Sequence, residues 1–452
     1  MPGKQRALVL QGGGALGAYE VGVLKVLCRK LIESSGNEGK DKPLFDIVAG
    51  SSMGAMNAAV LVSNVVNMHK TWEQAVGVLE DFWMNEKNGL SSPDISGWLN
   101  DAKKQKNFSA SPEAARRYYS VKHYLSQGTP NVCSPTSERD LRFGEQDPFK
   151  WPWYTSNLLQ HTIEQYSKDE NTEKLRIATS WNERQPRLLV ISVDVARGNT
   201  IAFDSYYKKD HSKNPVYDGD GITIDHIMAS GTIPAFYKFR EIGGRKFCDG
   251  GWLSNTPFRE LLRAHRDYWV KVAGVDTDEI PELDVYIVNV HPSNRDNVLT
   301  DYDEAKNRVN DILFLDRNSR YDEMVAYLAT DYNELADVSK DFTELIDKLK
   351  KLTKSHLTHT GENKIQTDLE HLLETAEEKR KRWSYESEKY KDLIKGNFRL
   401  NQVVRIERAN DIDTSTSHEA DYSSKPADFT HNTVEKLIEQ GEEDALEILK
   451  GL

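Results

Sequence analysis

Cysteine is scarce in this chain of 452 residues, because only Cys28, Cys133 and Cys248 occur and they lie far apart. An odd number of widely spaced thiols does not suit a disulfide framework. No group of His, Cys, Asp or Glu residues in the sequence has the spacing of metal ligands. We therefore expect a reducing compartment and no metal site.

Long apolar runs are also missing, and the mean hydropathy is −0.64. No run approaches the roughly 20 residues that a membrane-spanning helix needs. Residues 1–6 contain no apolar core of the kind that a secretion signal carries. The sequence therefore predicts a cytoplasmic protein without a signal peptide or a transmembrane segment, and it leaves peripheral contact with a membrane open.

Positive charge is in short supply, with 59 Lys and Arg residues against 71 Asp and Glu residues and a net charge of −12. This balance argues against nucleic-acid binding. Residues 301–452 hold 34 of the acidic and 23 of the basic residues. Residues 1–300 are therefore nearly neutral, and no strong field opposes their approach to an anionic lipid surface.

A serine turn stands out in this near-neutral part. The apolar run 45–49 predicts a buried strand, and the alanine-rich run 53–62 predicts a helix. Between them lies a Gly-x-Ser-x-Gly pattern, with Ser52 at its centre and Gly50 and Gly54 on either side. Strand, tight turn and helix is the context of a nucleophile elbow. Ser51 lacks the symmetric glycines, so Ser52 is the predicted nucleophile; the alternative is a turn of small residues that only joins two elements.

A second glycine-rich segment follows the first predicted strand, 6–10. Gly12, Gly14 and Gly17 match a dinucleotide fingerprint, but that motif needs an acidic residue closing the next strand, which here ends at the serine turn. A P-loop would need a Gly-Lys-Ser/Thr ending, which is absent. The better interpretation is an oxyanion hole, since glycines at the start of a helix can direct N–H groups, Gly13 and Gly14 above all, at a developing negative oxygen.

A serine nucleophile needs a base, and Asp249 is the best candidate. It ends a short predicted strand in an aromatic and apolar segment, where partial desolvation would raise its pKa. Gly250 and Gly251 leave room for a serine to approach. The alternative is an ordinary Asp-Gly turn. His226 and His291 are the candidates for a hidden histidine base, although each is also expected as an ordinary polar residue.

The rest of the chain predicts further strands at 175–180, 187–193, 200–203 and 283–290, and a short helix at 223–229. The aromatic cluster 149–154 predicts either a lid that contacts lipid or a plug packed on the core. Two long helical patterns follow residue 300, then a strand at 398–407 and a helix at 433–449. We predict three parts: a catalytic domain at 1–298, a helical hairpin at 299–397, and a returning strand and helix at 398–452.

The glycine run 12–17, the serine turn 50–54 and Asp249-Gly250-Gly251, together with the blocks 229–236 and 255–257, resemble the patatin-like phospholipases. The resemblance covers roughly residues 4–295. It implies a three-layer α/β/α sandwich with a mostly parallel sheet, a Ser52–Asp249 dyad without histidine, and an oxyanion hole from the backbone of Gly12, Gly13 and Gly14. Gly17, Gly50, Gly54, Gly250 and Gly251 would support these motifs. No cofactor is implied.

One position departs from the family. Its members often carry Arg or Lys just before the last glycine of the first motif, where this chain has Leu16. A phosphate-steering role at that position is therefore not expected here.

The resemblance implies hydrolysis of fatty-acyl esters of lipids or phospholipids through an acyl-enzyme. Two alternatives stay open: an esterase or thioesterase acting on soluble acyl substrates, and a lipid-binding or scaffold protein with a latent site. The helical extension is a candidate for self-association into a homo-oligomer.

Overall fold

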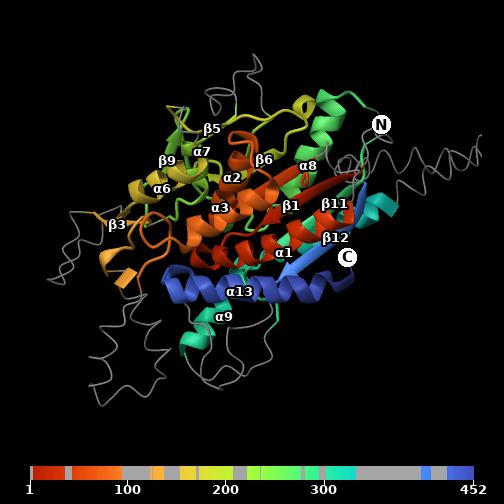
Figure 1. Ribbon diagram of the computed structural model, residues 1–452. Helices are drawn as coiled ribbons and strands as arrows, with labels where there is room; N and C mark the ends of the chain where they lie inside the picture. The colour runs from red at the N-terminus through yellow and green to blue at the C-terminus, as the bar shows by residue number, and fades with distance from the viewer. Residues whose placement is uncertain are drawn as a thin grey trace, which may run out of the picture. The chain divides into compact units, whose positions relative to one another are not determined.

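The computed structural model (Figure 1) describes residues 4–35, 43–93, 123–124, 126–136, 153–168, 173–206, 221–234, 236–275, 280–294, 302–331, 399–408 and 425–451. The chain forms two compact units. The larger unit consists of Gln5–Leu261, Asp284–Ser319 and Gln402–Leu452. The smaller unit consists of Met1–Lys4, Leu262–Leu283 and Arg320–Asn401. All of the predicted site residues belong to the larger unit.

An eight-stranded mixed sheet forms the centre, in the order β12-β11-β1-β2-β6-β10-β9, with β7 paired to β6. Strands β1, β2 and β6 run parallel, whereas β10 and β7 run antiparallel to β6 and β9 antiparallel to β10. The bounds are β1 Gln5–Leu10, β2 Ile47–Ser51, β6 Arg187–Asp194, β7 Asn199–Asp204, β9 Arg240–Ile242, β10 Arg245–Asp249, β11 Leu283–Asn289 and β12 Leu400–Glu407.

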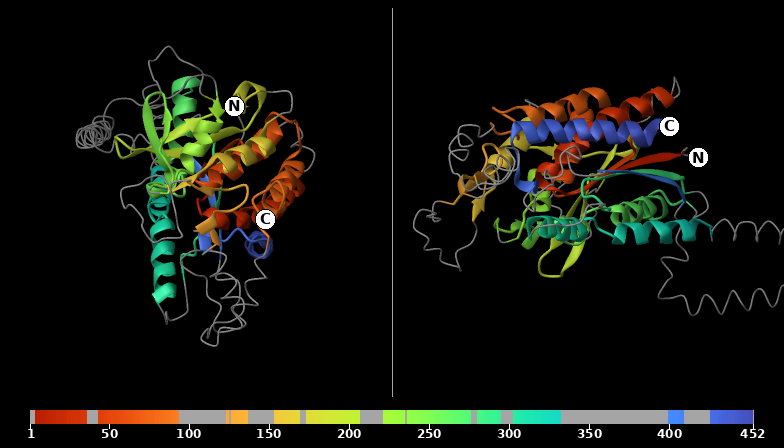
Figure 2. Two further views of the ribbon diagram at one scale, coloured as in Figure 1. Left: turned by 90° about the vertical axis from the view of Figure 1, so that its left-hand side faces the viewer. Right: turned by 90° about the horizontal axis from the view of Figure 1, so that it is seen from below.

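Helices cover both faces of this sheet. Every residue of β2 and β6 is buried, as expected for strands covered on both sides. Figure 2 shows α1 (Ala18–Ser35), α3 (Trp72–Met84) and α13 (His431–Ile448) on one side of the sheet and α9 (Tyr302–Phe314) on the other. The predicted mostly parallel, layered α/β fold is confirmed.

The remaining elements flank the sheet. They are η1 Gly14–Gly17, α2 Met53–Val66, β3 Ser134–Pro135, β4 Tyr154–Thr155, α6 Asn157–Ser167, β5 Arg176–Ile177, η3 Trp181–Glu183, β8 Ile222–Thr223, α7 Ile224–Ser230, η4 Gly250–Trp252, α8 Phe258–Asp267, the π-helical turn η5 Tyr268–Val272, η8 Lys425–Ala427 and η9 Leu449–Gly451. Among these, α2 runs directly from the predicted serine turn, and η1 directly from the glycine run.

One expectation needs correction in detail. The predicted strand 175–180 shortens to β5, which pairs with β8 in a separate two-stranded sheet. Its partner β8 lies outside the central sheet and pairs with it at two positions only. Of the aromatic cluster 149–154, residues 149–152 lie outside the described residues. Tyr154 is buried and its ring lies 5.9 Å from that of Phe236, as the plug interpretation expects, whereas Trp153 is exposed.

Much of the predicted helical hairpin falls outside the described residues. Residues 318–331 are helical, whereas 332–398 are not described. The division at 298 and 397 and self-association through the hairpin stay predictions. Within the residues that the structure does describe, we find no helix that combines the length and the apolarity needed to cross a bilayer.

Candidate active site

Ser52 lies at the junction of β2 and α2, in a backbone conformation that few side chains adopt. Its φ is +52° and its ψ is −125°, and it is the N-cap of α2. This strain pushes the side chain out of the turn, toward the positive end of the helix dipole. Gly50 and Gly54 pack so closely that a Cβ on Gly50 would lie 2.4 Å from the Gly54 carbonyl oxygen. The small flanking residues are therefore needed for the elbow.

The register of three strands brings Asp249 to Ser52. Ser51 pairs with Ile191 on one side of β6, and Asp249 pairs with Ser192 on the other side. Ser52 and Asp249 therefore lie on either side of the end of β6, one strand width apart. Ser52 Oγ donates a hydrogen bond to Asp249 Oδ2 at 2.7 Å.

The environment of Asp249 suits a base. Its carboxylate is 5% exposed, and burial, the largest effect, raises its pKa to about 6. Hydrogen bonds from Ser52 Oγ and from Gly251 N, the latter at 2.7 Å, act in the opposite direction and lower the pKa. The result is a carboxylate that is ionised near neutral pH but more basic than an exposed one.

The glycine run passes directly beside the elbow. A Cβ on Gly12 would lie 2.9 Å from Ser52 Cβ, so only glycine permits this approach. Gly12 N donates to Asn255 O at 3.3 Å. Among the described residues, no acceptor takes the N–H of Gly13 or Gly14. Gly14 has a φ of +58° and opens η1.

Three side chains hold this loop and the elbow in place, and sequence reasoning assigned none of them a role. Asn255 Nδ2 donates to Gly12 O at 2.9 Å. Gln11 Oε1 accepts from Val290 N at 2.8 Å, while its Nε2 donates to Thr256 Oγ1 at 2.8 Å. Ser230 Oγ accepts from Ser52 N at 2.9 Å. Asn255 and Ser230 lie inside the blocks 255–257 and 229–236, which was the available signal.

The other candidate residues do not take part in the Ser52–Asp249 pair. Ser51 is buried at the end of β2, and among the described residues its Oγ has no hydrogen-bond partner. His226 accepts from Thr223 N and caps α7. His291 faces Asp311 at 3.2 Å, and burial lowers its pKa. Gly17 packs against Met53, and Gly250 and Gly251 turn the chain away after Asp249.

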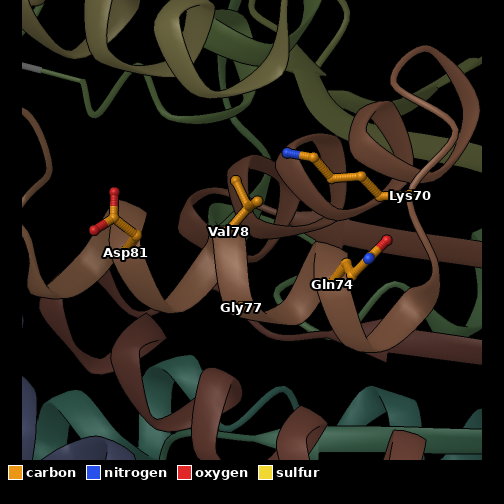
Figure 3. Close-up of a pocket in the computed structure, with 5 residues that line it drawn as sticks. All are labelled: Lys70, Gln74, Gly77, Val78 and Asp81. Carbon is orange, nitrogen blue, oxygen red and sulfur yellow. The ribbon is translucent and has the colours of Figure 1, made fainter.

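The open hollow in Figure 3 lies along α3, away from these groups. It is lined by Lys70, Gln74, Gly77, Val78 and Asp81. None of these residues was predicted to carry chemistry. The described residues also contain no cluster of three or more His, Cys, Asp or Glu side chains able to hold a metal ion.

Comparisons with known proteins give one family match. A family model described as patatin-like phospholipase matches residues 8–262. A cGAMP-activated phospholipase of Vibrio cholerae is 25% identical over 291 residues, which are 63% of this chain and 63% of that protein's length. The solved structure of VipD from Legionella pneumophila aligns over 97% of this chain and 67% of VipD, at 13% identity and a TM-score of 0.29.

Proposed function

The chain belongs to the patatin-like phospholipase family, and on this premise we propose that it hydrolyses fatty-acyl ester bonds of lipids or phospholipids through Ser52 and Asp249. The observation that carries the proposal is the 2.7 Å hydrogen bond from Ser52 Oγ to the buried Asp249 carboxylate at the strained turn. A hydroxyl paired with a base in this way is an activated nucleophile.

In the acylation step, Asp249 takes the proton of Ser52 Oγ while the oxygen attacks the ester carbonyl carbon. The negative charge that develops on the carbonyl oxygen is stabilised by the N–H groups of Gly13 and Gly14, with help from the dipole of α2. When the C–O bond to the alcohol breaks, the protonated Asp249 returns its proton to the leaving oxygen. Ser52 then carries the acyl group as an ester.

Deacylation repeats these steps with water. Asp249 takes a proton from the water molecule, whose oxygen attacks the acyl carbon, and the same N–H groups stabilise the oxyanion. Collapse of this intermediate releases the fatty acid, and the proton on Asp249 returns to Ser52 Oγ. The site therefore regains its starting state without a cofactor.

The test compares fatty-acid release by the wild type, Ser52→Ala and Ser51→Ala, from mixed phospholipid vesicles and from a soluble short-chain ester. Ser51 is a matched control because it is the adjacent serine and lies buried. Ser52→Ala should lower the rate by several orders of magnitude, whereas Ser51→Ala should retain most of it.

Each other outcome selects an alternative. Cleavage of the soluble ester without release from vesicles would favour an esterase or thioesterase. Release that persists in Ser52→Ala would overturn the proposed mechanism. Because the Vibrio cholerae relative is named for activation by cGAMP, the assay is run with and without this nucleotide. Release only in its presence would favour an enzyme under the same kind of control, and no release in either condition would favour a lipid-binding or scaffold protein.

A further inference from the structure

Apolar side chains are exposed immediately after the proposed base. Trp252 is 55% exposed and Leu253 is 47% exposed, three and four residues beyond Asp249. Both lie in or next to η4, the turn whose N-cap is Asp249. Most large apolar side chains in a folded domain are buried, so exposed ones beside a site indicate a surface that contacts another molecule.

Helix α9 exposes three of its large apolar side chains and buries two of its polar ones. Val309, Ile312 and Leu313 are exposed, and Leu313 reaches 67%. Asn307 and Asp311 are buried. A helix that only covered a sheet would show the opposite pattern. The outward face of α9 is therefore suited to contact with something apolar.

Three contacts hold the end of α9 against the segment that follows Asp249. The rings of Trp252 and Phe314 meet edge to face, with centroids 5.9 Å apart. Asn255 Nδ2 donates to Phe314 O at 2.6 Å, and Thr256 N donates to Asp316 Oδ2 at 2.9 Å. The exposed groups on η4 and α9 are therefore parts of one surface beside Ser52 and Asp249.

The fully exposed charged side chains within residues 305–319 are basic. Lys306 and Arg317 are exposed and bracket the apolar residues of α9. Within residues 305–319 neither acidic side chain is fully exposed: Asp311 is buried against Lys425 Nζ at 2.8 Å, and Asp316 is partly buried and accepts from Thr256 N. Apolar groups between cations match the interface of an anionic membrane.

We propose that this surface, formed by Trp252, Leu253, Lys306, Val309, Ile312, Leu313 and Arg317, docks on the face of an anionic phospholipid bilayer. The apolar side chains enter the boundary of the acyl chains, and the two cations contact the headgroups. The inference rests on the proposed function, since docking here would present the Ser52–Asp249 site to its substrate.

The test measures binding separately from hydrolysis. Chain carrying Ser52→Ala is sedimented with vesicles of phosphatidylcholine alone or mixed with phosphatidylglycerol. Adding Leu313→Glu should weaken binding by about tenfold or more, because a leucine side chain that would enter the bilayer is replaced by a charge. Leu446→Glu is the matched control, since Leu446 is an exposed leucine on α13, and it should leave binding unchanged.

A second variant tests the cations. The pair Lys306→Gln and Arg317→Gln should weaken binding to the phosphatidylglycerol vesicles by at least about tenfold and leave binding to pure phosphatidylcholine unchanged. Raising the salt concentration should reproduce this loss in the chain that keeps both cations. Equal sensitivity for both vesicle types would contradict the charge match.

Hydrolysis of the soluble ester by chain with Ser52 intact shows whether each variant folds; Leu313→Ser replaces Leu313→Glu if that variant does not. The proposal is overturned if vesicle binding is equal for Leu313→Glu, for Leu446→Glu and for the chain that carries Ser52→Ala alone. The proposal is also overturned if the chain forms a dimer that Leu313→Glu dissociates while vesicle binding persists. The surface would then be an interface with a second copy of the chain. Loss of vesicle binding on Leu313→Glu, together with no hydrolysis by the chain that keeps Ser52, would retain the docking surface and reject the hydrolase.

Discussion

At the scale of single residues, the buried carboxylate of Asp249 sets how activity depends on pH. As the proposed base it must be ionised, and its pKa is raised to about 6 by burial. We expect kcat/KM for a soluble ester to rise with pH, to reach half its maximum near pH 6, and to level off above about pH 7. A kcat/KM that stays at its maximum down to about pH 4.5 would contradict this role for Asp249.

The same carboxylate should lower stability at neutral pH. Its pKa in the folded protein, about 6, lies above the ordinary value of 3.8, so the folded state binds the proton more tightly than the unfolded state. The stabilising contribution of the protonated Asp249 to folding is therefore complete below about pH 4 and is lost as the pH rises through 6. Asp249→Asn should raise the free energy of unfolding near pH 7 by up to about 3 kcal/mol.

Urea unfolding of the wild type and Asp249→Asn at about pH 7 and about pH 4 measures this effect. The stability difference should shrink at the lower pH, where the carboxyl group is protonated. Asn is nearly isosteric with Asp, so the comparison changes charge more than packing. A variant that is no more stable than the wild type at either pH would show that the buried charge carries no such penalty.

At the scale of elements, two glycines decide how closely α1 and α13 pack. A Cβ on Gly22 would lie 1.9 Å from Ile438 O, and one on Gly441 would lie 2.2 Å from Tyr19 O. Such contacts with backbone atoms can be relieved only by moving a whole helix. The absence of side chains at these two positions therefore permits the contact that joins the C-terminal helix to the larger unit.

Gly441→Ala should accordingly lower the free energy of unfolding by about 1–3 kcal/mol, despite the better helix propensity of alanine. Gly77→Ala is the matched control in α3, because a Cβ there meets nothing within 4 Å; Gly77 lines the hollow of Figure 3. It should raise stability by up to about 1 kcal/mol. Urea unfolding measures both, and equal effects of the two substitutions would refute the packing argument.

At the scale of the whole molecule, the C-terminal segment of the chain supports the glycine run near its start. Lys425 Nζ lies 2.8 Å from Asp311 Oδ1, which also faces His291. The next residue, Pro426, places its carbonyl oxygen 2.4 Å from where a Cβ on Gly14 would stand. Burial is the largest single effect on Asp311 and raises its pKa, but the hydrogen bond with His291 and the charge of Lys425 together hold the pKa below its ordinary value. The three groups therefore anchor η8 against the proposed oxyanion loop.

Lys425→Met should leave the Asp311 carboxylate buried without its cation and lower stability by about 3 kcal/mol. Because η8 would lose its anchor, the rate of soluble-ester hydrolysis should fall as well, even where the variant is fully folded. Lys450→Met, at an exposed lysine in the same C-terminal segment, is the control and should change neither quantity. Unchanged hydrolysis by folded Lys425→Met would show that η8 does not position the loop.

The features that the sequence could predict are local ones. The elbow depends on an apolar run, small residues around Ser52 and an alanine-rich helix, all within about twenty consecutive residues, so its pattern is visible in the chain. Strand β12 and helix α13 were predicted for the same reason. Asp249 was predicted to be the base from its apolar neighbours and the two glycines that follow it, which are also local features of the sequence.

The tertiary structure alone decided the contacts that join distant parts of the chain. The pairing of Asp249 with Ser52 spans 197 positions and depends on the register of β6 between β2 and β10. Gln11, Ser230 and Lys425 gained their roles in the same way, because no period or propensity records which carbonyl or carboxylate a side chain will meet. The exposed apolar side chains of α9 also required the fold, since sequence periodicity finds an apolar stripe but does not tell which side of a helix the sheet will cover.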